Sequence, residues 1–107
     1  MAVRRASLCF TAESDSRNNL MSKLRFCVYV LLSHKDNLLY IGFTENLKQR
    51  LTDHFHGHSQ ATSPRRPFRL IYCEYYFSKK DARRRERYLK TNPGKRMLKL
   101  MLKGTLI

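Results

Sequence analysis

The side chains that could do chemistry in this sequence are two phenols, a guanidinium, an imidazole and a carboxylate. A phenol, with a pKa of about 10, takes a proton from water at neutral pH only when nearby cations and hydrogen bonds lower that pKa or pass the proton on. A guanidinium can hold two phosphate oxygens at once, and an imidazole with a pKa of about 6.5 suits proton relay or phosphate contact. A single carboxylate suffices for Mg²⁺, which completes its coordination with water and phosphate oxygens. The five residues are Tyr29, Tyr40, Arg50, His54 and Glu86.

Each of these residues also has an ordinary structural explanation. Tyrosines in strands are most often packing aromatics. Arg50 could be a solvated helix residue, and His54 could be a packed histidine with its hydrogen bonds satisfied. Glu86 could pair with Arg83 or Lys90, each about one turn away on the same helix.

The histidines offer a further alternative, because His54, His56 and His58 alternate along the chain and could attract a transition metal. We expect Gly57 to end the helix there, which would point the three rings in different directions. A histidine metal site is therefore the weaker interpretation.

The first elements that must position these groups form a predicted β-hairpin. Residues 26–32 and 38–43 are rich in β-branched and aromatic side chains and flank a polar stretch, which is typical of two strands joined by a turn. With a four-residue loop over residues 33–36, the antiparallel register places Tyr29 directly opposite Tyr40 on one face of the sheet. The two phenols are then neighbours.

A helix over residues 47 to about 56 follows the hairpin, with Asn46 as its predicted N-cap. Leu47, Leu51 and Phe55 form an apolar stripe along it. At 100° per residue, Arg50 and His54 fall inside that stripe, in an arc of roughly 140°. Both ionisable groups should therefore point towards the sheet.

The second half of the chain predicts a strand and two more helices. Residues 68–77 form a third strand, and Ser78 with Asp81 is a capping signature for a helix over residues 79–90. Glu86 shares the inward face of that helix with Ala82 and Leu89. Asn92, Pro93 and Gly94 then break the chain before a short amphipathic helix over about residues 95–103. The predicted fold class is α/β, a small three-stranded antiparallel sheet flanked by helices in the order β-β-α-β-α-α.

This order of elements, with Tyr29 and Tyr40 eleven residues apart and Arg50 ten further on, resembles the GIY-YIG nuclease domain. The two halves of the motif read Val28-Tyr29-Val30 and Tyr40-Ile41-Gly42. The resemblance covers about residues 26–102. The chain is similar to the small single-domain bacterial members, which carry segments like "LYIGFT" and "ARRRERYLKT", and to the N-terminal incision domain of the excinuclease C subunit.

The resemblance implies a metal-dependent DNA endonuclease that hydrolyses phosphodiester bonds, one strand per active site. A tyrosine orients or deprotonates the attacking water; we favour Tyr29 for this role, with Tyr40 as its partner. Arg50 stabilises the developing charge, and His54 matches family variants with His at that place. Glu86 is the expected ligand of Mg²⁺, with Mn²⁺ as a substitute. We expect no small-molecule cofactor and a monomer or weak dimer.

The chain departs from the family pattern at two positions. Val28 stands where the family name has Gly, which many members tolerate. Many members also carry an Asn well after the metal-binding Glu, whereas Asn92 is only six residues beyond Glu86. That role is therefore not carried over to Asn92, and Thr91 or Lys95 could substitute.

The charge of the chain indicates a polyanionic partner. The 22 Lys and Arg residues outnumber 8 Asp and Glu residues, for a net charge of +14. Residues 79–103 alone hold eleven cations and two acids. We expect contacts with the DNA phosphate backbone that weaken steeply with salt. The candidate nucleic-acid-binding residues are Arg65, Arg66, Lys79, Lys80, Arg83, Arg84, Arg87, Lys90, Lys95 and Arg96.

The remaining features bound the domain organisation. Residues 1–25 lack a sustained hydrophobic period and predict a mobile tail, within which Met21 is an alternative start, and residues 26–103 form the nuclease-like domain. The longest apolar run has seven residues, which excludes a membrane-spanning helix, and nothing indicates a secretory signal. We expect a cytoplasmic protein with reduced thiols at Cys9, Cys27 and Cys73.

Two rival interpretations explain the positive charge without a catalytic activity. One is a basic module with this fold that binds nucleic acid without cleaving it. The other is a ribosome-associated protein that binds RNA, which is supported by charge alone. For a nuclease, repair, recombination, mobile-element movement and host defence are all compatible pathways.

Overall fold

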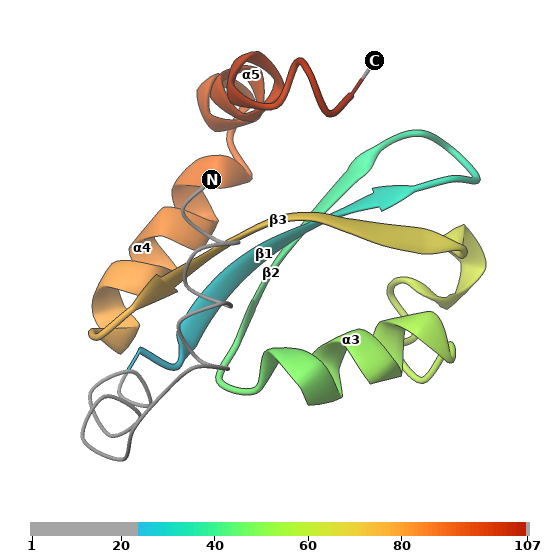
Figure 1. Ribbon diagram of the computed structural model, residues 1–107, viewed down its shortest axis with the longest axis horizontal. Helices are drawn as coiled ribbons and strands as arrows, with labels where there is room; N and C mark the ends of the chain where they lie inside the picture. Colours follow the sequence, from blue (N-terminus) through green and yellow to red (C-terminus); the bar gives the residue numbers. More distant parts are fainter. Residues whose placement is uncertain (1–23, 107) are drawn as a thin grey trace, which may run out of the picture.

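The computed structural model describes residues 24–106, so most of the predicted tail, together with Cys9 and Met21, lies outside the described residues. Figure 1 shows the order of the elements. They are β1 (Phe26–Ser33), β2 (Leu39–Thr44), α3 (Leu47–Phe55), a 3₁₀ turn η1 (Ser63–Arg65), β3 (Phe68–Tyr76), α4 (Lys79–Leu89) and α5 (Asn92–Met101). The predicted order and the three-stranded antiparallel sheet are confirmed.

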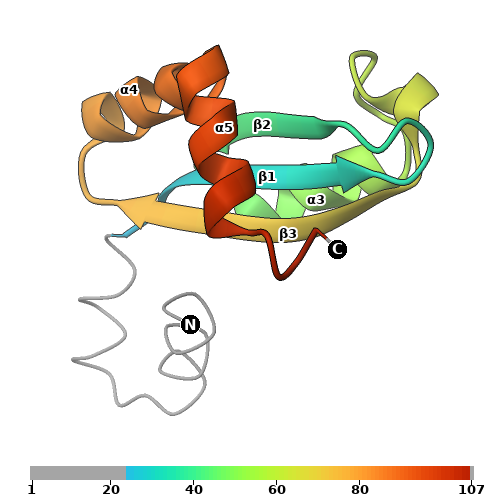
Figure 2. The same cartoon turned by 90° about the horizontal axis from the view of Figure 1, so that it is seen from above.

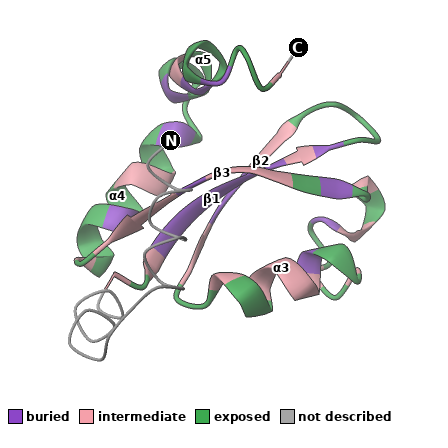
Figure 3. Ribbon diagram, in the orientation of Figure 1, coloured by how far each residue is buried: buried purple, intermediate pink, exposed green. Residues whose placement is uncertain are grey.

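The sheet has the order β2-β1-β3, so β1 is its central strand. α3 covers one face, and α4 and α5 lie on the other (Figures 1 and 2). Alternate residues of β1 therefore enter two different cores: Tyr29 packs with Cys27 and Leu31 on the α3 side, whereas Val28 and Val30 pack under α4 and α5. Figure 3 shows this strand as the most continuously buried element.

The predicted register of the hairpin is wrong by two residues. Tyr29 lies opposite Gly42, and Tyr40 lies opposite Leu31. The cause is the turn: the Ser33 hydroxyl accepts hydrogen bonds from the next backbone N–H groups, and Asn37 adopts a left-handed φ of 59°. β1 therefore extends to Ser33, and the loop lies further along the chain than predicted, before β2 begins at Leu39. Because Tyr40 is the diagonal neighbour of Tyr29 on the same face, the phenols are still adjacent.

α3 begins and ends where local signals place it. The Asn46 side chain accepts a hydrogen bond from the Gln49 backbone N–H, and Gly57 with a φ of 78° follows the last turn. The predicted apolar stripe is wrong at its end, because Phe55 is 43% exposed while His54 is fully buried. At the C-terminal end of α3, His54 and not Phe55 therefore packs between the helix and the sheet.

The start of α5 corrects the predicted break at residues 92–94. These residues form the first helical turn, and the Thr91 hydroxyl accepts a hydrogen bond from the Gly94 N–H. Pro93 fits because first-turn N–H groups have no partner within the helix. A Cβ atom at Gly94 would clash with the backbone carbonyl of Tyr88, so glycine allows the close corner between α4 and α5.

A carboxylate network anchors α4 to the sheet. Glu74 of β3 accepts hydrogen bonds from Tyr72 Oη at 2.7 Å, from Tyr76 Oη at 2.6 Å and from Arg85 of α4 at 3.0 Å. Burial opposes ionisation of Glu74, but these donors outweigh it and lower its pKa. The network holds the helix that carries Glu86.

Candidate active site

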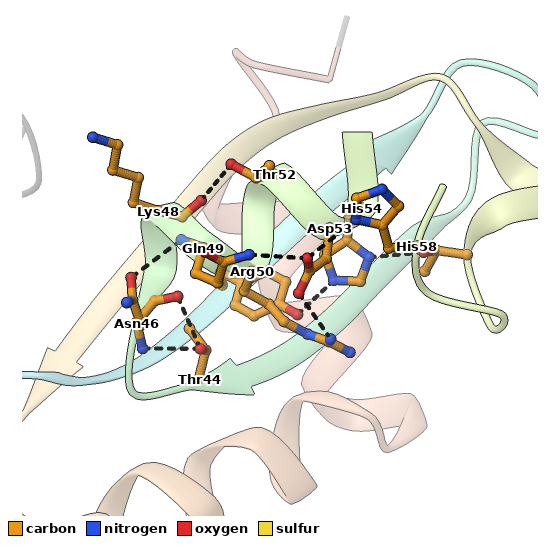
Figure 4. Close-up of polar contacts among 11 residues, drawn as sticks. Thr44, Asn46, Lys48, Gln49, Arg50, Thr52, Asp53, His54 and His58 are labelled. Carbon is orange, nitrogen blue, oxygen red and sulfur yellow. Dashed lines mark hydrogen bonds and ion pairs between the residues drawn. The ribbon is translucent and has the colours of Figure 1, made fainter. Parts of the chain in front are cut away.

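Four of the five predicted catalytic side chains meet on the α3 face of the sheet. The ring centroids of Tyr29 and Tyr40 are 6.3 Å apart. The His54 ring lies 5.6 Å from the Tyr29 ring and 5.1 Å from the Tyr40 ring. Arg50 lies one turn before His54 on α3, and Figure 4 shows both side chains projecting from the same side of the helix. We call these residues, Tyr29, Tyr40, Arg50 and His54, the quartet.

Gly42, the last residue of the Tyr40-Ile41-Gly42 segment, leaves the space that the Tyr29 ring occupies. A Cβ atom at Gly42 would overlap the end of the Tyr29 phenol ring, so this ring lies directly against the glycine backbone. Tyr29 is only 1% exposed as a result. The glycine is needed for close approach of a side chain, because it shows no unusual backbone conformation.

His54 connects the sheet to the loop after α3. Its Nε2 atom lies 2.7 Å from Tyr29 Oη, and its Nδ1 atom lies 2.7 Å from Thr62 Oγ1. Burial lowers the pKa of His54, and the nearby positive charge of Arg50 lowers it further against the weaker effect of Asp53. The imidazole is therefore neutral at pH 7.

Arg50 supplies the positive charge of the quartet. Its side chain is 37% exposed, and its Nη1 atom lies 3.8 Å from the Asp53 carboxylate. Figure 4 draws this ion pair as a dashed line. Burial raises the pKa of Tyr29 to about 12, and the proximity of Arg50 partly offsets that rise. The guanidinium is thus accessible to an anion while it faces the phenols.

Glu86 lies on α4, the helix that packs against the sheet face opposite α3. Its side chain is 12% exposed, as its predicted inward position requires. Its carboxylate lies 3.4 Å from Arg83 Nη1 and accepts a hydrogen bond from Lys90 Nζ at 2.9 Å. The ion pairs considered as its alternative role are therefore present. No hydrogen bond or ion pair among residues 24–106 joins Glu86 to the quartet.

The donor set around Glu86 fits a metal ion that the substrate largely coordinates. No cluster of three or more His, Cys, Asp or Glu side chains suited to a metal occurs within residues 24–106, and this includes the histidines around Gly57. Glu86 offers one carboxylate, whose Oε2 atom accepts from Lys90 at 2.9 Å and whose Oε1 atom has only the longer contact with Arg83, at 3.4 Å. Mg²⁺ takes one or two carboxylates and fills its other positions with water and phosphate oxygens, so one donor matches its requirements.

Some of the predicted nucleic-acid-binding residues form ion pairs with Asp or Glu side chains, and the others do not. Arg65 is the most constrained, because it pairs with Asp36 at 2.8 Å and donates to the Leu38 carbonyl. This pair lowers the pKa of Asp36 to about 2. Arg66 is exposed and donates to the carbonyls of Ser63 and Phe55.

The basic residues of α4 and α5 follow the same division. Four of the predicted residues have acidic partners, namely Lys79, Arg83, Arg84 and Lys90. Four others are exposed and have no ion pair within the described part of the chain, namely Lys80, Arg87, Lys95 and Arg96. The α5 helix contributes cations and no acid to this surface.

Sequence reasoning missed two residues that hold the site in place. Thr62 is fully buried in the loop after α3, and nothing in its local sequence marks it as a partner of His54. Arg85 is absent from the predicted functional residues, although it is the one basic residue of α4 that reaches Glu74. An acid in the middle of an otherwise apolar strand was the available signal for that pair.

Comparison with known proteins agrees with this geometry. The model of the GIY-YIG catalytic domain matches residues 25–99. A UPF0213 protein of Staphylococcus haemolyticus is 41% identical over 63% of this chain and 83% of its own length. UPF0213 proteins of Limosilactobacillus reuteri and Pediococcus acidilactici are each 35% identical, the first over 77% of this chain and 88% of its own length, the second over 89% and 93%. No solved structure gives a significant match. The chain belongs to the GIY-YIG family.

Proposed function

We propose that this protein is a metal-dependent DNA endonuclease that hydrolyses phosphodiester bonds, one strand at each active site. The observation that carries the proposal is the 2.7 Å contact between Tyr29 Oη and His54 Nε2, beside the accessible Arg50. A proton acceptor and an anion-binding group thus lie next to each other. GIY-YIG domains are nuclease domains, which gives this arrangement a reaction class.

The chemistry divides among these groups. Water attacks phosphorus while Tyr29 accepts its proton and passes its own phenolic proton to His54, because a phenol with a pKa of about 12 is already protonated at neutral pH. Arg50 binds the phosphate oxygens that gain negative charge, and Tyr40 packs against the His54 ring. Glu86 would hold Mg²⁺, which when bound neutralises charge on the phosphate and the leaving oxygen.

DNA is the proposed partner because of the charge distribution. The unpaired cations of α4 and α5 suit contacts with a phosphate backbone. The described residues contain no base-reading module, so we propose selection by DNA shape, ends or branches. We further propose that the enzyme acts in the cytoplasm as a monomer or weak dimer, with a double-strand break requiring two events.

The test compares two substitutions of cations on α3. Arg50→Ala should lower kcat by roughly 10²- to 10³-fold, because it removes the donor that stabilises developing charge. Lys48→Ala removes an exposed cation from the same helix and should leave kcat unchanged. Cleavage of nicked, branched, single-stranded and duplex DNA is measured with Mg²⁺ and with a chelator, with RNA as the competing substrate. Equal activity in both variants, or activity that survives chelation, contradicts the proposal.

A second candidate function is a nucleic-acid-binding module without turnover. The observation that favours it is the pairing of Glu86, the expected metal ligand, with Arg83 and Lys90. This function predicts that DNA binding survives Glu86→Ala and that no cleavage occurs with Mg²⁺ or Mn²⁺. A protein that binds RNA more tightly than DNA, with no effect of Tyr29→Phe, would indicate the RNA-binding alternative.

A further inference from the structure

A buried threonine completes a three-residue chain of hydrogen bonds. Thr62 and His54 are both 0% exposed, and Tyr29 is 1% exposed, so all three side chains are shielded from bulk solvent. Thr62 Oγ1 lies 2.7 Å from His54 Nδ1, and His54 Nε2 lies 2.7 Å from Tyr29 Oη. Within residues 24–106, no other side-chain acceptor lies at hydrogen-bonding distance from the Thr62 or Tyr29 hydroxyl; the other group close to Tyr29 Oη is the Arg50 guanidinium. The open question is therefore which group donates and which accepts in each of these two hydrogen bonds.

The direction follows from which neighbours can accept a proton. Arg50 faces the Tyr29 oxygen and carries only donors, so the phenolic proton cannot point to it. The His54 Nε2 atom is the acceptor at hydrogen-bonding distance. A phenol is also a far better donor than an aliphatic hydroxyl, and its oxygen is a poorer acceptor, because the ring withdraws its lone pair. Both facts favour an arrangement in which Tyr29 Oη donates to His54 Nε2 and His54 Nδ1 donates to Thr62 Oγ1.

We infer that Thr62 is a positioning residue that holds His54 as its Nδ1–H tautomer, so that Nε2 accepts the phenolic proton of Tyr29. The inference rests on the proposed function for its role in catalysis, but the tautomer is a property of the protein alone. Thr62 takes the place that an orienting group has in a base constellation, although it is uncharged. The loop that carries it is tied to the hairpin by the Asp36–Arg65 ion pair.

The proton movement is balanced within this chain. As water adds to phosphorus, its proton goes to Tyr29 Oη and the phenolic proton moves to His54 Nε2. The O–H bond of water breaks, a new P–O bond forms as the P–O bond to the leaving oxygen of the DNA breaks, and that oxygen takes a proton from solvent. The imidazole becomes a cation whose Nδ1–H still donates to Thr62, and it returns the proton to solvent after the products leave. Other ionisable groups face the chain from every neighbouring element: Arg50 and Asp53 on α3, Tyr40 on β2, Cys27 on β1 and Cys73 on β3.

The decisive measurement is the NMR signature of the His54 ring nitrogens, assigned by the loss of its signals in His54→Gln. Two-bond proton–nitrogen spectra tell a protonated ring nitrogen from an unprotonated one. We expect protonation at Nδ1 only, in the wild type and in Thr62→Ser, at neutral pH. Thr62→Val has the same shape without a hydroxyl and should shift population to the Nε2–H form. A wild-type spectrum with Nε2–H, or a valine variant that keeps the wild-type pattern, overturns the inference.

Activity gives an independent readout. Thr62→Val should lower kcat for DNA roughly 100-fold with KM changed less than about twofold, and Thr62→Ser should restore most of the rate. Thr52→Val is the matched control, since the Thr52 hydroxyl only donates to the Lys48 carbonyl on α3. An unchanged kcat in Thr62→Val contradicts the inference. If the wild type cleaves nothing, the nuclease proposal fails, while the wild-type spectrum still decides the tautomer even if the valine variant does not fold.

Discussion

At the scale of residues, the site consists of groups whose properties depend on immediate contacts. The residue types pointed to Tyr29, Tyr40, Arg50 and His54, and the structure brings these four together. The partner of His54 was unpredictable, because Thr62 is eight residues away in a polar loop whose path no local pattern specifies. A loop residue that becomes fully buried can be found only from coordinates.

The contact between Gly42 and Tyr29 predicts the effect of one added methyl group. Gly42→Ala should displace the Tyr29 ring and destabilise the fold by roughly 1 to 3 kcal/mol, because the strand has no space for a Cβ atom. Cleavage should fall with it. The measurements are urea unfolding and DNA cleavage at a temperature where the variant is folded. Gly104→Ala is the control, since no atom lies within 4 Å of its added Cβ.

Burial of His54 predicts how stability changes with pH. Its folded pKa is lowered, so between the unfolded value of 6.5 and the folded value only the unfolded chain binds the proton. The free energy of unfolding should therefore decrease as pH falls below 6.5, by at most about 1.4 kcal/mol per pH unit from this group. Urea unfolding from pH 7.5 to 5 measures the slope. His54→Gln should flatten it; a slope that changes as much in His56→Gln, at an exposed site, would argue against this origin.

At the scale of elements, local signals were sufficient for most of the fold. Asn46 and Ser78 cap their helices as predicted, because a capping side chain bonds only to the backbone three residues on. The hairpin register and the start of α5 were not predictable in the same way. The first depends on the turn conformation at Asn37, and the second on the close packing of Gly94 against α4.

The anchoring of α4 by Glu74 predicts an unequal cost for two similar substitutions. Glu74→Gln should destabilise the protein by roughly 3 kcal/mol, because Arg85 would remain partly buried without its counter-charge. Glu45→Gln changes an acid that is 42% exposed in its pairs with Arg25 and Lys79, and it should cost less than about 1 kcal/mol. Thermal and urea unfolding measure both. Equal costs would mean that the network does not hold α4 to the sheet.

At the scale of the whole molecule, the sheet separates two groups of candidate functional residues. The quartet lies between the sheet and α3, whereas the basic helices α4 and α5 cover the opposite face of the sheet, as Figure 2 shows for the helices. No helix within residues 24–106 has the length and apolar character to cross a bilayer. The net charge of +14 was readable from composition, but its division into paired and unpaired cations needed the structure.

The unpaired cations of α5 predict the salt dependence of DNA binding. The double substitution Lys95→Ala and Arg96→Ala should weaken binding at low salt and reduce the slope of log affinity against log salt by about 2, one for each lost phosphate contact. Fluorescence anisotropy at several salt concentrations measures this slope. Lys35→Ala, at the hairpin tip where Lys35 donates to the Pro64 carbonyl, should leave the slope unchanged. A slope that is the same in the double variant excludes α5 from the DNA interface.

The central position of β1 ties the integrity of the protein to its chemistry. Successive residues of this strand enter opposite cores, so inserting or deleting a single residue there would send Tyr29 under α4 and bring Val28 against His54. A protein with such an insertion or deletion is therefore not expected to keep a stable fold with only its site residues displaced. Folding into the correct alignment and assembling the reactive groups are one and the same event.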